Sequence, residues 1–312
     1  MTDAIDTRGL KKRYRKVEAL RGLDLAVPKG SICGFLGPNG AGKTTTIRIL
    51  MGLSRPSEGW AAILGNDIGN NELGTRSRIG YLPQHPSFFP RAEVRDVLRF
   101  AAKCYLSGPA SQIRTRIDEI LDLVGLDNRA DRQVKNLSGG ELRRLGIGQA
   151  VIGDPDLLIL DEPFVGLDPE GRREVLDLLS DLRGQMTVFY SSHILDDVQR
   201  VADHVVIVDH GMVVDQGPMN LFLGGATATY AVALDGDGGA VIDRLGNEPW
   251  VQTTRSTGSG TWEVETGDRT SAEHGLLRAL ASGNGTRVTE LRPLQRNLED
   301  IYLDLVEETN DD

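Results

Sequence analysis

Hydrophobic positions over the first 225 residues alternate between short β-rich runs and segments of helical period. The runs predicted to form buried strands are 31–36, 157–160, 187–190 and 205–208. After Pro169, apolar residues follow the i, i+3, i+4, i+7 spacing of an amphipathic helix, with Asp168 as its predicted N-cap. Strands that alternate with helices predict an α/β domain built on a largely parallel sheet.

Between residues 88 and 136 the pattern becomes all helical. Two apolar stripes recur at helical spacing: Val94, Val97, Leu98, Ala101 and Ala102 in the first, and Ile113, Ile117, Ile120, Leu121 and Val124 in the second. We therefore predict a helical insertion in the α/β core, at about residues 86–150.

The pattern changes again from about residue 226. Strand-like segments surround two candidate helices at 240–245 and 271–281, in the β-α-β-β-α-β order of a ferredoxin-like domain. A last stripe at Leu298, Ile301, Tyr302 and Leu305 predicts a terminal helix. The expected division is a large domain at 1–225 and a small α+β accessory domain at 226–312.

Composition and charge narrow the class of protein. A length of 312 residues fits two domains, and a net charge of -10 argues against a protein that coats nucleic acid. No apolar run approaches the roughly 20 residues needed to cross a bilayer, and the amino terminus lacks the apolar core of a secretory signal. We expect Cys33 and Cys104 to be small buried side chains in a protein of the reducing cytosol.

Residues 37–44 have the glycine spacing of a phosphate-binding loop, with a β-rich run before them and a helical run after them. Glycines let backbone N–H groups point at phosphate oxygens, and Lys43 and Thr44 have the side chains to reach the β- and γ-phosphates and to bind Mg²⁺. A glycine-rich turn is the alternative, and the flanking pattern favours nucleotide binding. The predicted contacts in this segment are Gly37, Pro38, Asn39, Gly40, Ala41, Gly42, Lys43, Thr44 and Thr45.

Two acidic residues, Asp161 and Glu162, follow the apolar run 157–160. Parallel sheets bind their ligands at the carboxyl ends of such buried strands. We expect Asp161 to join the Mg²⁺ shell and Glu162 to polarise the water that attacks the γ-phosphate. The alternative for Asp-Glu-Pro is an ordinary strand exit before a turn.

A third string, Leu-Ser-Gly-Gly-Glu at 137–141, combines two properties. Ser138 and Glu141 have the spacing of a capping box, which predicts a helix start. The same hydroxyl, with the glycine N–H groups at a helix N-terminus, also suits an anion. The interpretation as a helix cap and the interpretation as an anion site are compatible.

Taken in order, the strings GPNGAGKTT, YLPQHPSF, LSGGE, LLILDEP, GLDP and SSH resemble the nucleotide-binding subunit of an ATP-binding cassette (ABC) transporter over about residues 5–222. The resemblance implies a P-loop NTPase with a parallel sheet core, and ATP and Mg²⁺ as cofactors. It also implies a homodimer or heterodimer of ATPase subunits, and separate membrane subunits docked on the helical insertion. The expected location is cytoplasmic, peripheral on the inner face of the cell membrane.

The resemblance also assigns roles to single residues. Tyr14 would stack on adenine, Gln84 would link the Mg²⁺ and water site to the insertion, and His193 would contact the γ-phosphate. The residues expected to contact nucleotide held by a second subunit are Ser138, Gly139, Gly140, Glu141 and Asp168. The expected catalytic residues are Glu162, His193 and Lys43, and the expected metal ligands are Thr44, Gln84 and Asp161.

Three of these residues could instead have a purely structural role. Tyr14 could be a surface aromatic in a basic segment, Gln84 a turn residue, and His193 a capping residue before a helix. The chain also departs from the family pattern at Glu141, where Gln is commonest, at Val165, which replaces Ser or Thr, and at Arg15, where Gly is frequent. None of these departures removes a group that contacts phosphate or metal.

The last segment, 297–306, resembles the tail of exporter-type ATPases whose membrane subunit is a separate chain. The expected function is therefore ATP hydrolysis that powers transport, in the direction of export. The competing class is a soluble cassette ATPase that acts on ribosomes or DNA. One cassette, the acidic balance and the absence of sustained heptads disfavour that class. A role of the 226–312 domain as a ligand sensor or dimerisation module is compatible with either function.

Overall fold

The computed structural model describes residues 3–70, 73–223, 228–236, 238–281, 286–294, 298–299 and 301–302. Contacts divide it into two compact units, one that extends to Pro218 and another that begins at Met219. The predicted boundary between 225 and 226 lies outside the described residues and stays a prediction.

A mixed sheet, in the order β10-β9-β3-β8-β7-β6, forms the centre of the first unit. Strands β6, β7, β8, β3 and β9 run parallel, and β10 pairs antiparallel with β9. The bounds are β3 (Ile32–Leu36), β6 (Ile79–Leu82), β7 (Leu157–Leu160), β8 (Thr187–Ser192), β9 (His204–Asp209) and β10 (Met212–Pro218). The predicted strands at 31–36, 157–160, 187–190 and 205–208 are therefore confirmed.

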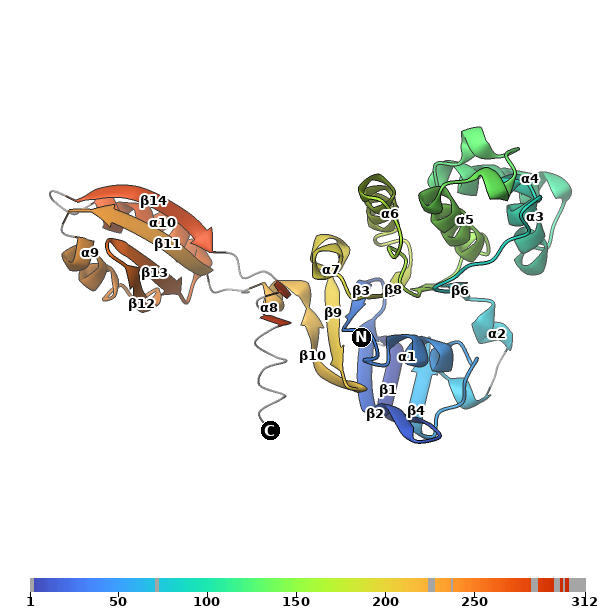
Figure 1. Cartoon of the computed structure of the whole chain (residues 1–312), viewed down its shortest axis with the longest axis horizontal. Coiled ribbons are helices and arrows are strands. Elements are labelled where there is room, and N and C mark those ends of the chain that lie inside the picture. Colours follow the sequence, from blue (N-terminus) through green and yellow to red (C-terminus); the bar gives the residue numbers. More distant parts are fainter. Residues whose placement is uncertain are drawn as a thin grey trace. The chain divides into compact units, whose positions relative to one another are not determined.

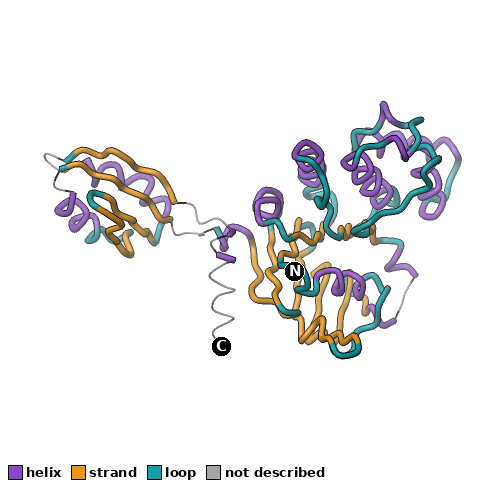
Figure 2. The backbone as a smooth tube through the Cα atoms, viewed as in Figure 1, coloured by secondary structure: helices purple, strands orange, loops and turns teal. Residues whose placement is uncertain are grey.

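Helices α6 (Pro169–Asp181) and α7 (Leu195–Val201) connect strands of this sheet, and α1 (Lys43–Leu50) follows β3 and leads out of the sheet, as Figures 1 and 2 show. Helix α6 begins as predicted, because the Asp168 carboxylate accepts the Gly171 N–H at 2.9 Å and Pro169 occupies the first helical position.

An antiparallel sheet, in the order β2-β1-β4-β5, belongs to the same unit and was not predicted. Its strands are β1 (Asp3–Tyr14), β2 (Val17–Pro28), β4 (Glu58–Ile63) and β5 (Asn66–Asp67), and the short helix α2 (Leu73–Arg76) leads from it towards β6. Several register shifts interrupt the β1–β2 pairing, so the alternation of apolar and polar residues that marks a half-buried strand is broken in the sequence.

The helical insertion comprises α3 (Val94–Tyr105), α4 (Ala110–Leu123) and α5 (Gly139–Val151), with 3₁₀ turns at Asp127–Arg129 and Val134–Asn136. Both predicted stripes are largely buried, with Val97 and Ile113 only partly covered. Cys33 is buried in β3, and burial raises the pKa of its thiol. The prediction for Cys104 is wrong, because it lies on the exposed face of α3, away from Val94, Leu98 and Ala101.

The second unit contains the short helix α8 (Met219–Phe222) and then follows the predicted β-α-β-β-α-β order. Its elements are β11 (Ala228–Asp235), α9 (Gly238–Leu245), β12 (Val251–Gly258), β13 (Thr261–Thr266), α10 (Arg269–Ala281) and β14 (Arg287–Leu294). All neighbouring pairs in the sheet β12-β13-β11-β14 are antiparallel, and both helices pack their apolar faces on it. Leu298 and Tyr302 are helical, and the remainder of the predicted terminal helix beyond 302 lies outside the described residues.

Candidate nucleotide-binding site

The register of the parallel sheet brings the predicted site segments to one edge. Leu36 pairs with Ser192, Leu160 pairs with Tyr190, and Leu82 pairs with Leu160. Segments that leave these strands at their carboxyl ends therefore start close together, which is where open α/β sheets bind ligands.

The loop between β3 and α1 wraps tightly, and two of its glycines are required by space. A Cβ at Gly37 would lie 2.2 Å from the Val208 carbonyl oxygen, and one at Gly42 would lie 2.8 Å from the Ala19 carbonyl oxygen. Gly42 also has a φ of 106°, in the left-handed region that favours glycine. Within the part of the chain that the structure describes, no side chain caps the N-terminus of α1 at Gly42. The first N–H groups of α1 thus suit an anion, as expected for a phosphate loop.

Lys43 is nearly buried, and its ammonium lies inside the loop. The Nζ atom donates to the Gly37 carbonyl oxygen at 2.6 Å and to the Pro38 carbonyl oxygen at 3.1 Å. It also forms an ion pair with Glu162 Oε1 at 3.2 Å, and both side chains are almost inaccessible to solvent, at 5% and 6%. A cation held among oxygen acceptors at this point is placed to bind a phosphate oxygen.

Asp161 follows β7 and is fully buried. Its Oδ1 accepts hydrogen bonds from the hydroxyls of Thr44, at 3.2 Å, and Ser191, at 2.8 Å. Burial raises the pKa of the Asp161 carboxyl, while these two hydrogen bonds lower it. Its other oxygen, Oδ2, is buried without a hydrogen-bond partner among the described residues.

The oxygens of Thr44 and Asp161 fit a magnesium ion. Mg²⁺ in phosphate-transfer sites is held by one or two protein oxygens, substrate phosphates and water, so it requires no large protein cage. An unpartnered carboxylate oxygen beside a threonine hydroxyl supplies donors of this kind. The described residues contain no cluster of three or more His, Cys, Asp or Glu side chains that suggests a different metal centre.

Glu162 places its carboxylate between Lys43 and His193. Oε2 lies 3.0 Å from His193 Nδ1, and Oε1 faces the Lys43 ammonium. The backbone N–H of Glu162 donates to Ser191 Oγ at 2.8 Å. The φ of Glu162 is 50°, a conformation that costs a non-glycine residue roughly 1–3 kcal/mol, so the surroundings must hold it there.

The structure confirms the capping box at the start of α5. The Glu141 N–H donates to Ser138 Oγ at 3.1 Å, and the Ser138 N–H donates to Glu141 Oε2 at 2.8 Å. Glu141 also pairs with Arg129 at 3.0 Å. Burial acts to raise the pKa of Glu141, but the Ser138 N–H and Arg129 outweigh it, and the net pKa is lowered. The charge that distinguishes Glu from the usual Gln is therefore balanced within the chain.

Tyr14, at the end of β1, is 42% exposed and has the Lys12 ammonium 4.8 Å from its ring centroid. Arg15 follows with a φ of 53°, a left-handed conformation that explains why a glycine suits this position. Gln84 lies in the segment after β6 and is partly buried. Among the described residues, no side-chain hydrogen bond or ion pair joins Tyr14, Gln84, Ser138 or Asp168 to the Lys43–Asp161–Glu162–His193 cluster. The nucleotide and metal roles of both groups of residues stay predictions.

The sequence patterns did not predict two residues that the structure places in this region. Ser191 is fully buried and holds both Asp161 and the Glu162 backbone, and its only signal was its place in the string SSH. Arg143 is 8% exposed and donates to the carbonyl oxygens of Gln84, at 3.0 Å, and Val165, at 3.3 Å. Burial lowers the pKa of Arg143, while Asp161 and Glu162 raise it.

The sequence is similar to a known protein family and to proteins of known name. The family model described as ABC transporter matches residues 20–165. The Nod factor export ATP-binding protein I of Cupriavidus metallidurans is 34% identical over 308 residues, 98% of each chain. The daunorubicin resistance ATP-binding protein DrrA3 of Streptomyces coeruleorubidus is 34% identical over 313 residues, 99% of this chain and 96% of that protein.

Solved structures agree with these relatives. The structure of cbiO1 from Clostridium perfringens, part of the ABC transporter complex cbiONQ, has a TM-score of 0.65 and 29% identity over 71% of this chain and 90% of that chain. The predicted P-loop fold and ATPase function are thereby confirmed. On its motifs, its fold and its full-length relatives, the chain belongs to the family of ABC transporter ATP-binding proteins, the subunits that hydrolyse ATP for transport.

Proposed function

We propose that this ATPase binds ATP with Mg²⁺ on the 37–45 loop, hydrolyses it with Glu162 as general base, and powers export through separate membrane subunits. The observation that supports the proposal most directly is the Glu162 carboxylate held between Lys43 and His193, next to Asp161 Oδ2, which has no hydrogen-bond partner among the described residues. Substrate, base and metal ligands would then meet at one edge of the sheet.

The residues of this cluster have distinct tasks in the proposal. Lys43 moves its hydrogen bonds from backbone carbonyls and Glu162 to the β- and γ-phosphates, whose charge makes them stronger acceptors. Glu162 then accepts the proton of the attacking water on a carboxylate oxygen. His193, about 40% exposed and hydrogen-bonded through Nδ1 to Glu162, orients that carboxylate and is the residue proposed to contact the γ-phosphate. Thr44 and Asp161, with Gln84 as a further ligand, would hold Mg²⁺, which when bound would neutralise phosphate charge.

Chelation of the metal is expected to abolish hydrolysis without unfolding the protein. Purified protein in excess EDTA should lose release of inorganic phosphate from ATP, and added Mg²⁺ should restore it. The thermal unfolding midpoint without nucleotide should not change, since the Thr44 and Asp161 oxygens already bond within the fold. Hydrolysis that persists in EDTA would contradict the assignment of Asp161 and Thr44 as metal ligands.

ATPase subunits of this family dimerise and work with membrane subunits. For this chain we propose that the Ser138–Glu141 segment and Asp168 contact ATP held by the second subunit. The N-terminus of α5 supports this, because glycine N–H groups and the Ser138 hydroxyl can receive an anion there. Homodimers and heterodimers both fit the proposal.

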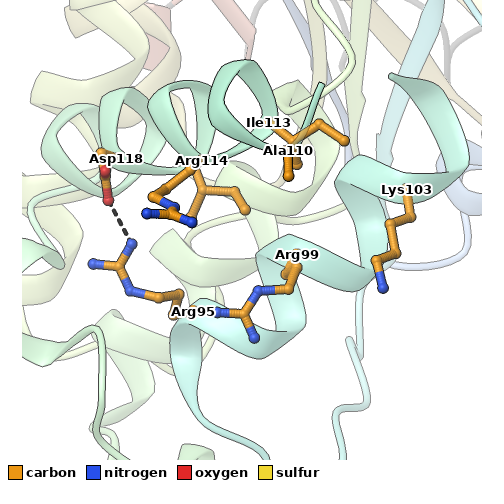
Figure 3. Close-up of a pocket in the computed structure, with 8 residues that line it drawn as sticks. Arg95, Arg99, Lys103, Ala110, Ile113, Arg114 and Asp118 are labelled. Atoms are coloured by element: carbon orange, nitrogen blue, oxygen red, sulfur yellow. Dashed lines mark hydrogen bonds and ion pairs between the residues drawn. The ribbon is translucent and has the colours of Figure 1, made fainter. Parts of the chain in front are cut away.

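The helical insertion is the proposed docking site for the membrane subunit. Three aromatic side chains on it are exposed, Phe89 at 83%, Phe100 at 71% and Tyr105 at 47%. On the same insertion, a groove of about 580 Å³ between α3 and α4 carries Arg95, Arg99, Lys103 and Arg114. Figure 3 shows these basic side chains around the space between the two helices, with Asp118 paired to Arg95.

Replacing Phe100 by Ser is expected to weaken docking at least tenfold and to leave the ATPase of the isolated subunit within twofold of the parent. Truncation of an interface hot spot costs about 2 kcal/mol or more, and 1.4 kcal/mol is about tenfold in affinity. The measurement is the amount of each variant that co-purifies with membranes from the cells that express it. Leu53→Ser, at an equally exposed apolar residue outside the insertion, is the control. Equal recovery of both variants would place the docking surface elsewhere.

The direction of transport and the location of the chain are also proposals. Relatives that align over nearly the whole chain are named for Nod factor export and daunorubicin resistance, which supports export by this chain. No helix among the described residues has the length and apolar character to cross a membrane. We propose a peripheral position on the cytoplasmic face through the membrane subunit, and an accessory role for the 226–312 domain.

A further inference from the structure

Arg172 and Asp197 form a largely buried ion pair that has no task in the site described above. Arg172 Nε donates to Asp197 Oδ1 at 2.5 Å. The Asp197 side chain is 2% exposed and the Arg172 side chain 33%. Asp197 Oδ2 is buried without a hydrogen-bond partner in the described part of the chain. A buried carboxylate with so few partners among the described residues depends strongly on Arg172, the cation that is hydrogen-bonded to it.

The pair joins the beginnings of α6 and α7, which lie side by side (Figure 1). Arg172 is in the first turn of α6, and its N–H donates to the Asp168 carbonyl oxygen at 2.9 Å. Asp197 is in the first turn of α7, which starts two residues after His193. The Tyr190 hydroxyl donates to the Asp197 carbonyl oxygen at 3.4 Å, which fixes this turn to β8 as well.

Other contacts between these helices lie farther from the site. Arg200 and Asp177 pair at 4.0 Å, with side chains 53% and 63% exposed. Arg183, which follows α6, donates to the Val201 carbonyl oxygen at 2.7 Å, at the end of α7. Exposed pairs of the first kind contribute little, so the buried pair sets the spacing at the ends that carry Asp168 and His193.

We propose that Arg172 and Asp197 are positioning residues that couple Asp168 to His193. Contact of Asp168 with the second subunit then fixes the position of the N-terminus of α6. Through the ion pair, the position of α6 sets the position of the first turn of α7, which orients His193 against Glu162. Hydrolysis at one site thereby depends on the nucleotide bound at the other. This inference rests on the proposed function, in which Asp168 faces the second subunit.

Arg172→Met and Asp197→Asn test the coupling. A displacement of about 1 Å at a reacting group can cost roughly 100-fold in rate, so kcat is expected to fall about 10- to 100-fold with KM nearly unchanged. The Hill coefficient for ATP should fall towards 1 in both variants. The double variant should lose no more than either single one, because both remove the same link. Asp197→Glu, which keeps the charge, should recover part of the cooperativity.

Two matched controls remove other arginines of α6 and α7 and leave the Arg172–Asp197 pair intact. Arg173→Met removes the neighbouring exposed arginine, and Arg200→Met breaks the exposed pair between the same helices. Both should keep the parental kcat and Hill coefficient.

Parental kcat and cooperativity in Asp197→Asn would overturn the proposal. A lowered unfolding temperature with unchanged kinetics per folded molecule would do the same, since that is a structural role alone. Asp197→Asn is nearly isosteric, so it decides the question even where Arg172→Met fails to fold. A parent that does not hydrolyse ATP with Mg²⁺ would overturn the proposed function and this inference with it, whereas an active parent isolates the coupling.

Discussion

Glu162→Gln is expected to lower ATP turnover by about 10³-fold while ATP binding persists. General bases contribute roughly 10²- to 10⁴-fold to rate, and an amide cannot accept the proton of the attacking water at neutral pH. The substitution keeps the shape of the side chain and leaves the Gly37 and Pro38 carbonyl oxygens bonded to Lys43. It also removes one carboxylate charge from the place where phosphate binds, so affinity for ATP should be retained or increased.

The variant should therefore accumulate as an ATP-bound dimer, detectable by size-exclusion chromatography in ATP with Mg²⁺. The matched control is Glu58→Gln. Glu58 also pairs with a lysine, Lys11 at 2.8 Å, but its side chain is 63% exposed and lies in the antiparallel sheet. Glu58→Gln should turn over ATP at the parental rate. A Glu162→Gln protein that did so too would remove Glu162 from the role of base.

Local chemistry explains which parts of the site the sequence alone could predict. The turn at Gly42, the capping box of Ser138 and the N-cap of Asp168 each depend on residues within a few positions of one another. The buried run 157–160 marks a parallel strand because both of its faces are covered. Asp161 and Glu162, at its end, could therefore be placed at the ligand edge of the sheet before their contacts were known.

Contacts between distant segments explain what was missed. Ser191 bonds to Asp161 30 residues away, and Arg143 reaches the Gln84 carbonyl across 59 residues. The antiparallel sheet pairs Ile5 with both Val27 and Ile63, and such pairings leave no local signal when register shifts break the alternation. Cys104 was misassigned because a cysteine is commonly buried, whereas the period of α3 turns this one to solvent.

Lys43→Met is expected to weaken ATP binding by about 100-fold and to bring hydrolysis below detection. A hydrogen bond to a charged group contributes roughly 1.5–3 kcal/mol, and 3 kcal/mol corresponds to somewhat more than 100-fold in affinity. Methionine fills the volume of the lysine stem but offers no donor. Glu162 would also lose the cation that it pairs with at 3.2 Å, and its uncompensated charge would repel phosphate. Calorimetric titration with ATP measures the affinity directly.

Arginine should not replace this lysine. The Lys43 ammonium donates to the Gly37 and Pro38 carbonyl oxygens at 2.6 and 3.1 Å as a compact point charge, and the planar fork of a guanidinium directs its donors differently. Lys11→Met, in the exposed pair with Glu58, should bind ATP like the parent and serves as the control. ATP affinity near the parental value in Lys43→Met would contradict the phosphate role of the loop.

Combining Lys43→Met with Glu162→Gln separates the two tasks. If Lys43 is needed for binding and Glu162 only for hydrolysis, the double variant should fail to form the ATP-bound dimer that Glu162→Gln alone accumulates. Removing the carboxylate relieves part of the repulsion that Lys43→Met creates, so the double variant should bind ATP more tightly than Lys43→Met, though well below the parent. A double variant that dimerised as readily as Glu162→Gln would show that the backbone of the loop holds the nucleotide without Lys43.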